Sequence, residues 1–221
     1  DSSLGALCGL NTTNPDVTIT EKNGQPTIEK QVKNGDTWGT TNDAKIGDTV
    51  EYKVEIKVAD GAQKYTVTDT MSKGLTFNSG SLKVTANGAQ TTNYTLTPTE
   101  NGFTLELPES YVSNLTKGTV ILVTYNATLN KKAVIDGDGN TNEVTLSYGN
   151  HQSTVPSKVT TKSYQFDLVK VDGTTNKLLD GAEFELADGN TKLSFVKDDD
   201  GNYRVAAAGE DGATTTITVK N

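Results

Sequence analysis

The 221-residue sequence has only one cysteine, Cys8, and only one histidine, His151. A lone cysteine excludes an intramolecular disulfide, and a lone histidine excludes a metal site built from several histidines. The pair also argues against a Cys–His catalytic dyad, which needs further groups to orient it. We therefore expect neither a metal nor a cofactor.

Basic residues and long apolar runs are also scarce. Lysine and arginine total 20 against 28 aspartate and glutamate residues, giving a formal net charge of −8. This balance disfavours nucleic acid as a partner, because neutralising phosphates requires clusters of lysine and arginine. No apolar run approaches the roughly 20 residues of a membrane span, and no signal peptide is visible. We expect no membrane contact in this fragment, with any secretion or anchoring signals outside it.

The residues that are abundant favour β-structure. The sequence has 21 glycines and a hydrophobic fraction of 33%, and threonine, asparagine and valine recur throughout. Its clearest strand is 49–58, where valine, tyrosine and isoleucine alternate with glutamate and lysine. Further strands are expected at 26–32, 65–71, 81–85, 94–97, 103–107, 119–129 and 142–148, with a helical turn within 108–115. Strands at this spacing predict an antiparallel β-sandwich of immunoglobulin type.

The chain is expected to hold two such units. Residues 1–16 show no periodicity and indicate a leader or linker. Residues 17–162 form the first predicted unit, which ends in an extended connector at 155–161. The second unit, 163–221, begins with an alternating strand at 164–170 but is short for an independent core. The prediction is an all-β chain of immunoglobulin-like antiparallel β-sandwiches in tandem, the second apparently truncated.

Three polar residues of the first unit fall on faces that their neighbours mark as apolar. Lys30 shares its face with Ile28 and Val32, and Asp69 and Asn142 also lie in phase with apolar residues. Burying an ammonium group is costly, and lysine is almost never fully buried without a partner. One interpretation places each residue at a strand end, where the face has already reached water. The other brings all three together in the core.

The second interpretation has a definite chemistry. A neutral lysine amine is a nucleophile, an asparagine carboxamide is an acyl group, and a protonated carboxyl group can polarise its carbonyl. Burial favours these neutral forms, because desolvation lowers a lysine pKa and raises an aspartate pKa. The product would be an amide between Lys30 and Asn142, with loss of ammonia and with Asp69 as general acid and proton shuttle.

Four ordered motifs carry a resemblance to a known family. The segments PTIEKQV, IGDTVEYKVEI, YTVTDTMSKGLTF and NTNEVTLSYGN resemble the isopeptide-forming domain of Gram-positive sortase-assembled pilins. The later segment FDLVKVDGTTNKLLDGAEFEL resembles the opening half of the collagen-adhesin B-type domain that often follows it. Together these resemblances cover nearly all of the chain from about residue 16.

The resemblance implies a role for each residue of the triad. Lys30 matches the lysine that forms the isopeptide bond, and Asn142 matches the asparagine that opens the N-x-V-x-L-x-Y strand. Asp69 matches the assisting acid, with Asp60 and Glu51 as nearby alternatives. The Lys30 and Asn142 matches favour the triad over three unrelated strand ends.

The resemblance also implies a structural function. We expect a surface pilus or adhesin-stalk subunit, extracellular and anchored to the cell wall of a Gram-positive bacterium, with other pilin subunits as partners through sortase. The alternative is an adhesin module that binds host extracellular-matrix protein or glycan through its loops. A turnover enzyme is not expected, because the amide-forming reaction would happen once in each chain.

The sequence departs from the family pattern at two lysines. The sortase acceptor motif Tyr-Pro-Lys-Asn is absent, so Lys22 in the segment TEKN is retained only as a candidate acceptor beside its alternative, an ordinary exposed lysine. Lys170 ends an apolar strand as Lys30 does, but the acid and asparagine of the second domain are missing. Glu183 and Glu185 point outward by parity, so we expect Lys170 to remain unbonded.

Two weaker patterns favour ordinary structural roles. Residues 136–140 begin like a calcium loop but lack its later glycine and glutamate, which favours a solvated acidic turn. Trp38 with Tyr52 or Tyr125 could form a sugar-binding platform, but packing in the core or at its rim is the preferred interpretation for lone aromatic residues in strands.

Overall fold

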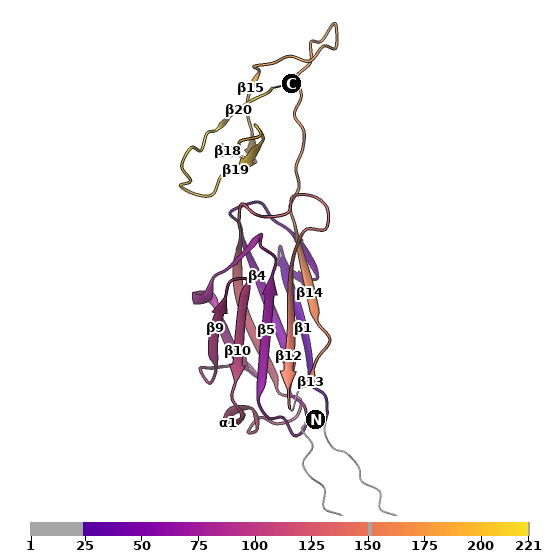
Figure 1. Cartoon of the computed structure of the whole chain (residues 1–221), viewed down its shortest axis with the longest axis vertical. Coiled ribbons are helices and arrows are strands. Elements are labelled where there is room, and N and C mark those ends of the chain that lie inside the picture. Colours follow the sequence, from indigo (N-terminus) through magenta and orange to yellow (C-terminus); the bar gives the residue numbers. More distant parts are fainter. Residues whose placement is uncertain (1–23, 150–151, 221) are drawn as a thin grey trace, which may run out of the picture.

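Two seven-stranded sheets stack face to face and form a β-sandwich (Figure 1). The structure is a computed structural model, and it describes residues 24–149 and 152–220. The predicted leader and Lys22 lie outside these described residues.

The first sheet runs in the order β2-β1-β4-β11-β7-β8, and β6 also pairs with β11. Its strands are β1 (Thr27–Asn34), β2 (Thr37–Gly39), β4 (Thr49–Lys57), β6 (Leu75–Phe77), β7 (Lys83–Ala86), β8 (Ala89–Thr91) and β11 (Val120–Leu129). Every pairing in this sheet is antiparallel.

The second sheet runs in the order β3-β14-β12-β5-β10-β9, and β13 also pairs with β12. Its strands are β3 (Thr41–Asp43), β5 (Tyr65–Met71), β9 (Thr95–Thr99), β10 (Gly102–Leu107), β12 (Asn140–Tyr148), β13 (Gln152–Ser153) and β14 (Ser157–Lys162). All pairings are antiparallel except β3 with β14. The predicted antiparallel sandwich is therefore confirmed.

The alternation seen in the sequence decides which residues enter the core. Along β4, Val50, Tyr52, Val54 and Ile56 are all buried, and the intervening glutamates and lysines face outward. Each fully buried aliphatic side chain contributes about 1.5–3 kcal/mol relative to exposure, so the inner faces of the two sheets provide most of the stability.

Helical structure is minor in the described part of the chain. It comprises the 3₁₀ turn η1 (Ser79–Ser81) and the single-turn helix α1 (Glu109–Val112), which falls within the predicted segment 108–115. Pro108 precedes α1 in an extended conformation, and Val112 packs into the core. No helix of this part is both long and apolar enough to span a membrane.

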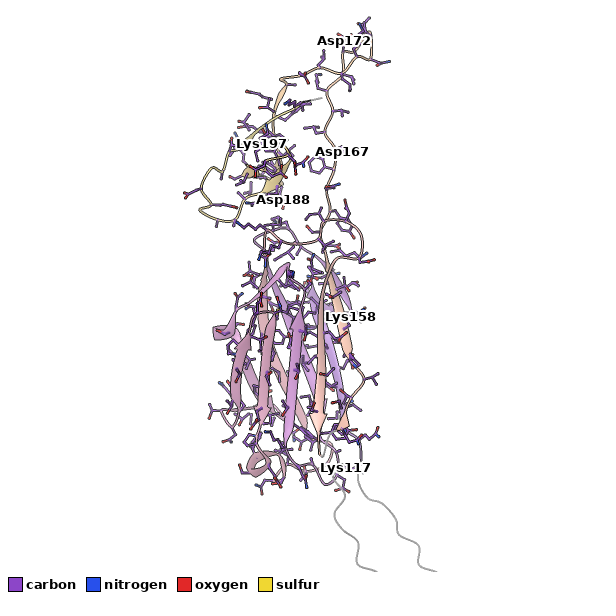
Figure 2. All side chains as sticks on the ribbon, viewed as in Figure 1. Lys117, Lys158, Asp167, Asp172, Asp188 and Lys197 are labelled. Atoms are coloured by element: carbon purple, nitrogen blue, oxygen red, sulfur yellow. The ribbon has the colours of Figure 1, made fainter. Side chains whose placement is uncertain are left out.

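The expectation that residues 155–161 form only an extended connector was wrong. From Ser157 they form β14, which pairs with β12 and β3. Lys158 projects from the surface (Figure 2), whereas Val159 and Thr161 are buried, so β14 alternates like the other sandwich strands. The final strand of the sandwich therefore lies between β12 and the edge strand β3.

The C-terminal part of the chain is differently built. It contains three separate two-stranded sheets, whose strands are β15 (Glu183–Glu185) with β20 (Thr216–Thr218), β16 (Ala187–Asp188) with β17 (Thr191–Lys192), and β18 (Phe195–Lys197) with β19 (Tyr203–Val205). The strand predicted at 164–170 does not form, and Tyr164 and Phe166 are exposed. Apolar alternation alone does not make a strand when no neighbouring strand pairs with it.

Candidate functional site

The three predicted residues converge between the two sheets. Lys30 lies on β1 of the first sheet, while Asp69 and Asn142 lie on the adjacent strands β5 and β12 of the second. In the β12–β5 register Asp69 stands opposite Val144, two positions from Asn142, so both polar side chains project from the same face toward β1. One sheet of the sandwich therefore provides the lysine, and the facing sheet provides both of its partners.

All three side chains are buried. Lys30 is 1% exposed, Asp69 2% and Asn142 0%. The alternative interpretation, in which each residue sits at a strand end in water, is therefore excluded. Asp60 and Glu51, the other acids considered, are exposed, and Glu51 pairs with Lys33 at 3.0 Å.

The lysine amine contacts both partners. Lys30 Nζ donates to Asn142 Oδ1 at 2.5 Å and also contacts Asp69 Oδ2. The nucleophilic nitrogen therefore lies against the carboxamide it would attack and beside a group that can take its proton. Asp69 Oδ1 has no hydrogen-bond partner among the described residues, so the carboxyl group acts through one oxygen.

A fourth residue belongs to the site. The Tyr125 hydroxyl on β11 donates to Asp69 Oδ2 at 2.5 Å and accepts from Asn142 Nδ2 at 3.3 Å. No direct hydrogen bond joins Asp69 to Asn142; the tyrosine hydroxyl lies between them. Sequence reasoning assigned Tyr125 only to packing or a sugar platform, because an inward tyrosine on a strand is common in cores.

Aromatic rings enclose the amine. Tyr52 and Tyr125 are stacked with ring centroids 5.4 Å apart, and Lys30 Nζ lies 5.4 Å and 5.3 Å from their respective centroids. Phe103 packs edge-on against Tyr125 at 5.0 Å. The rings hold water away from the amine, and their burial confirms the packing interpretation for Tyr52 and Tyr125 over the sugar platform.

Burial shifts the pKa of each reacting group toward its neutral form. Desolvation lowers the pKa of Lys30 from its usual 10.5 to about 8, against the opposing attraction of Asp69. Desolvation also raises the pKa of Asp69, although Lys30 and Tyr125 partly offset this. The neutral amine that must attack the carboxamide is therefore more accessible here than in water.

A glycine on the neighbouring strand packs closely against Asp69. Gly102 on β10 lies against Asp69 with a φ of +133°, a conformation that disfavours other residues. A Cβ at this position would overlap the Asp69 carbonyl oxygen. Gly102 thus lets β10 approach Asp69 closely. Within the described residues, no group of three His, Cys, Asp or Glu side chains could hold a metal ion.

The fold and this site define a β-sandwich in which a buried lysine and asparagine from opposite sheets meet beside an acid. Residues 46–152 match the family described as Gram-positive pilin backbone subunit 2, Cna-B-like domain. This stretch of the chain is therefore similar to a domain of Gram-positive pilin backbone subunits. No curated protein is significantly similar to the chain in sequence.

Solved pilin structures share the fold. The T6 backbone pilin of serotype M6 Streptococcus pyogenes is 22% identical with a TM-score of 0.63, and the match covers 89% of this chain and 52% of that one. The 35 kDa C-terminal fragment of the Streptococcus agalactiae major pilin GBS80 is 19% identical with a TM-score of 0.61, covering 88% and 79%. The group B streptococcus pilus 2b backbone protein is 26% identical with a TM-score of 0.53, also covering 88% and 79%. The chain thus spans about half the length of the T6 pilin.

Proposed function

We propose that this chain is a subunit of a Gram-positive pilus stabilised by an autocatalytic isopeptide bond between Lys30 and Asn142. The observation that carries this proposal is the buried approach of Lys30 Nζ to the Asn142 carboxamide, 2.5 Å from Oδ1. The two residues come from opposite sheets and are 112 positions apart. An amide between them would tie the two layers of the sandwich together covalently.

The reaction needs no external reagent. Neutral Lys30 Nζ attacks Asn142 Cγ, forming the new N–C bond and a tetrahedral centre with charge on Oδ1. The Cγ–Nδ2 bond then breaks, and the nitrogen leaves as ammonia. Overall, one proton moves from Lys30 Nζ to Asn142 Nδ2, and Asp69 is placed to receive it first. The fold supplies the effective concentration by holding amine and carboxamide in contact.

Intact mass tests the proposal directly. The purified chain is expected to be lighter than its sequence by one ammonia, and a tryptic digest is expected to contain the Lys30 and Asn142 peptides joined by an amide. The Asn142→Ala chain, which cannot react, is the control and should have its full sequence mass. Recovery of separate, unmodified Lys30 and Asn142 peptides from the parent would refute the bond.

The pKa of Lys30 gives a pH-dependent prediction for the unbonded chain. In Asn142→Ala, Lys30 remains an amine whose pKa in the folded state is lowered from 10.5 to about 8. Between these values the unfolded chain binds a proton that the folded chain does not, so the free energy of unfolding rises with pH. The bonded parent has no amine at this position. We therefore expect the parent's advantage in melting temperature over Asn142→Ala to narrow from pH 8 to pH 10.5. An advantage that stays constant over this range would contradict a buried, depressed Lys30.

The rest of the proposal concerns assembly. We propose that residues 17–162 form the isopeptide domain, that 163–221 form part of a second, collagen-adhesin B-type domain, and that sortase links subunits into a fibre anchored to the cell wall. The match of residues 46–152 to the pilin backbone family and the fold shared with solved pilins support this proposal. Lys170 is exposed, in keeping with an unbonded lysine. Binding of a host protein or glycan through the loops remains a prediction that a binding screen can test.

A further inference from the structure

The reaction proposed above requires a proton to travel, and Asp69 alone does not complete its path. The proton leaves Lys30 Nζ, which Asp69 Oδ2 contacts. It must arrive at Asn142 Nδ2, to which Asp69 makes no hydrogen bond. The Tyr125 hydroxyl spans this gap, at 2.5 Å from Asp69 Oδ2 and 3.3 Å from Asn142 Nδ2.

The four groups form a closed circuit around the reacting carbon. Starting from the amine, the order is Lys30 Nζ, Asp69 Oδ2, Tyr125 hydroxyl and Asn142 Nδ2. Asn142 Cγ and Oδ1 close the circuit, because Oδ1 accepts from Nζ. A hydroxyl can accept a proton on one side and donate its own on the other, so it transfers a proton without a net change of charge. No other side chain in the described structure is hydrogen-bonded to both Asp69 and Asn142 through one atom of its own, apart from Lys30 itself.

We propose that Tyr125 is a catalytic residue that relays the proton from Asp69 to the departing nitrogen of Asn142. The inference rests on the isopeptide reaction proposed above. Asp69 enters the reaction as a carboxylate, and its Oδ2 takes the proton from Nζ as the tetrahedral centre forms. As the Cγ–Nδ2 bond breaks, the Tyr125 hydroxyl gives its proton to Nδ2 and receives one from Asp69. Ammonia leaves, and both Asp69 and Tyr125 regain their starting states, so atoms and charges balance.

The surroundings of Tyr125 favour a role in proton transfer over a role in core packing alone. Its ring is stacked on Tyr52 and held edge-on by Phe103, which fixes the position of the hydroxyl. Burial, with Asp69 nearby, raises the Tyr125 pKa well above its usual value, so the phenol keeps its proton. A relay needs such a group, because a phenolate beside Asp69 would have no proton to pass on.

The test is the Tyr125→Phe chain, which keeps the ring and removes only the hydroxyl. The full chain is made by cell-free synthesis, translation is stopped, and aliquots are quenched in denaturant for intact-mass analysis over time. The matched control is Tyr65→Phe. Tyr65 is another buried core tyrosine, and its hydroxyl makes one ordinary hydrogen bond, accepting from the Ala59 amide at 3.2 Å. Circular dichroism and native proteolysis check that both variants fold.

The expected result is that Tyr125→Phe loses ammonia roughly 100-fold more slowly than the parent, at the lower end of general acid–base effects, while Tyr65→Phe keeps the parental rate. The slowing should persist at every pH from about 5 to 9, since the relay itself is absent. A Tyr125→Phe rate equal to that of the parent would overturn the relay and leave the isopeptide bond intact.

Two further outcomes separate this inference from its alternatives. If Tyr125→Phe regains the parental maximum rate at a shifted pH, the hydroxyl only tunes the pKa of Asp69, and the relay is wrong. If the parent itself never loses ammonia, the proposed bond fails, and the relay fails with it.

Discussion

Replacing Asp69 with alanine is expected to give a folded chain that keeps its full sequence mass and melts far below the parent. Without Asp69, Lys30 Nζ loses the group that takes its proton. The amide does not form, and the chain loses the cross-link that would constrain its unfolded state. For a closed loop of about 100 residues, a cross-link of this kind is worth about 4–5 kcal/mol by analogy with a disulfide.

A second loss adds to the first in this variant. Lys30 remains buried, and its carboxyl partner is gone. Breaking a buried pair by removing one member costs about 3–5 kcal/mol. Together the two losses predict a fall in melting temperature of roughly 20 °C or more, measured by differential scanning calorimetry.

The control for this experiment is Asn142→Ala, which also lacks the amide but keeps Lys30 beside Asp69. Its melting temperature should lie between those of the parent and Asp69→Ala. The difference from the parent measures the contribution of the cross-link, and the difference from Asp69→Ala measures the cost of leaving Lys30 unpaired. Loss of ammonia by Asp69→Ala would show that another acid assists the reaction and that the assignment of Asp69 is wrong.

Pulling the chain from its two ends should reveal a segment that does not extend. The proposed amide joins residues 112 positions apart, from β1 at the start of the sandwich to β12 near its end. Load would enter along β1, cross the Lys30–Asn142 amide and leave through β12. The strands between these two residues would carry no tension.

Force spectroscopy measures whether the strands between Lys30 and Asn142 extend under load. At about 3.3–3.6 Å per residue, the Asn142→Ala chain should release roughly 370–400 Å more contour length than the parent when its sandwich unfolds. Handles placed identically on both chains make them a matched pair. If the parent released the same length as the variant, force would not pass through these two side chains.

The sequence predicted the triad because each member breaks a period-two pattern and because the family motifs match Lys30, Asp69 and Asn142. Lys30 lies between Ile28 and Val32, and its burial follows from the face that those neighbours define. Asp69 and Asn142 lie in phase with apolar residues in the same way. Alternation can place a residue on the inner face, but it cannot show which residue of the other sheet it meets.

That limit explains why Tyr125 was missed. An inward tyrosine fits an apolar face without conflict, so its pattern gives no sign of chemistry. Its role depends on how β11 of one sheet stands above β5 and β12 of the other, and packing sets that relation rather than local sequence. A signal was available: the phenol at this inward position needs a hydrogen-bond partner, and the predicted triad offers two.

The errors at 155–161 and 164–170 have opposite causes. Residues 155–161 were predicted to be a connector, although Val159 and Thr161 alternate as a strand requires. At 164–170 the alternation was clear, but strand formation also needs a hydrogen-bonding partner. No residue of 164–170 belongs to a strand or bridge, and the isolated bridge between Val171 and Leu178 lies just beyond this segment.

The complete enclosure of the Lys30 site also bears on the direction of the reaction. Ammonia released there would pass from the core into the surrounding water, where dilution and protonation would remove it. Re-forming the carboxamide would require neutral ammonia to return to a site whose lysine, acid and asparagine are at most 2% exposed. Dilution and protonation of the ammonia would therefore make the step irreversible in practice. Each folded subunit would keep its cross-link for as long as the polypeptide lasts.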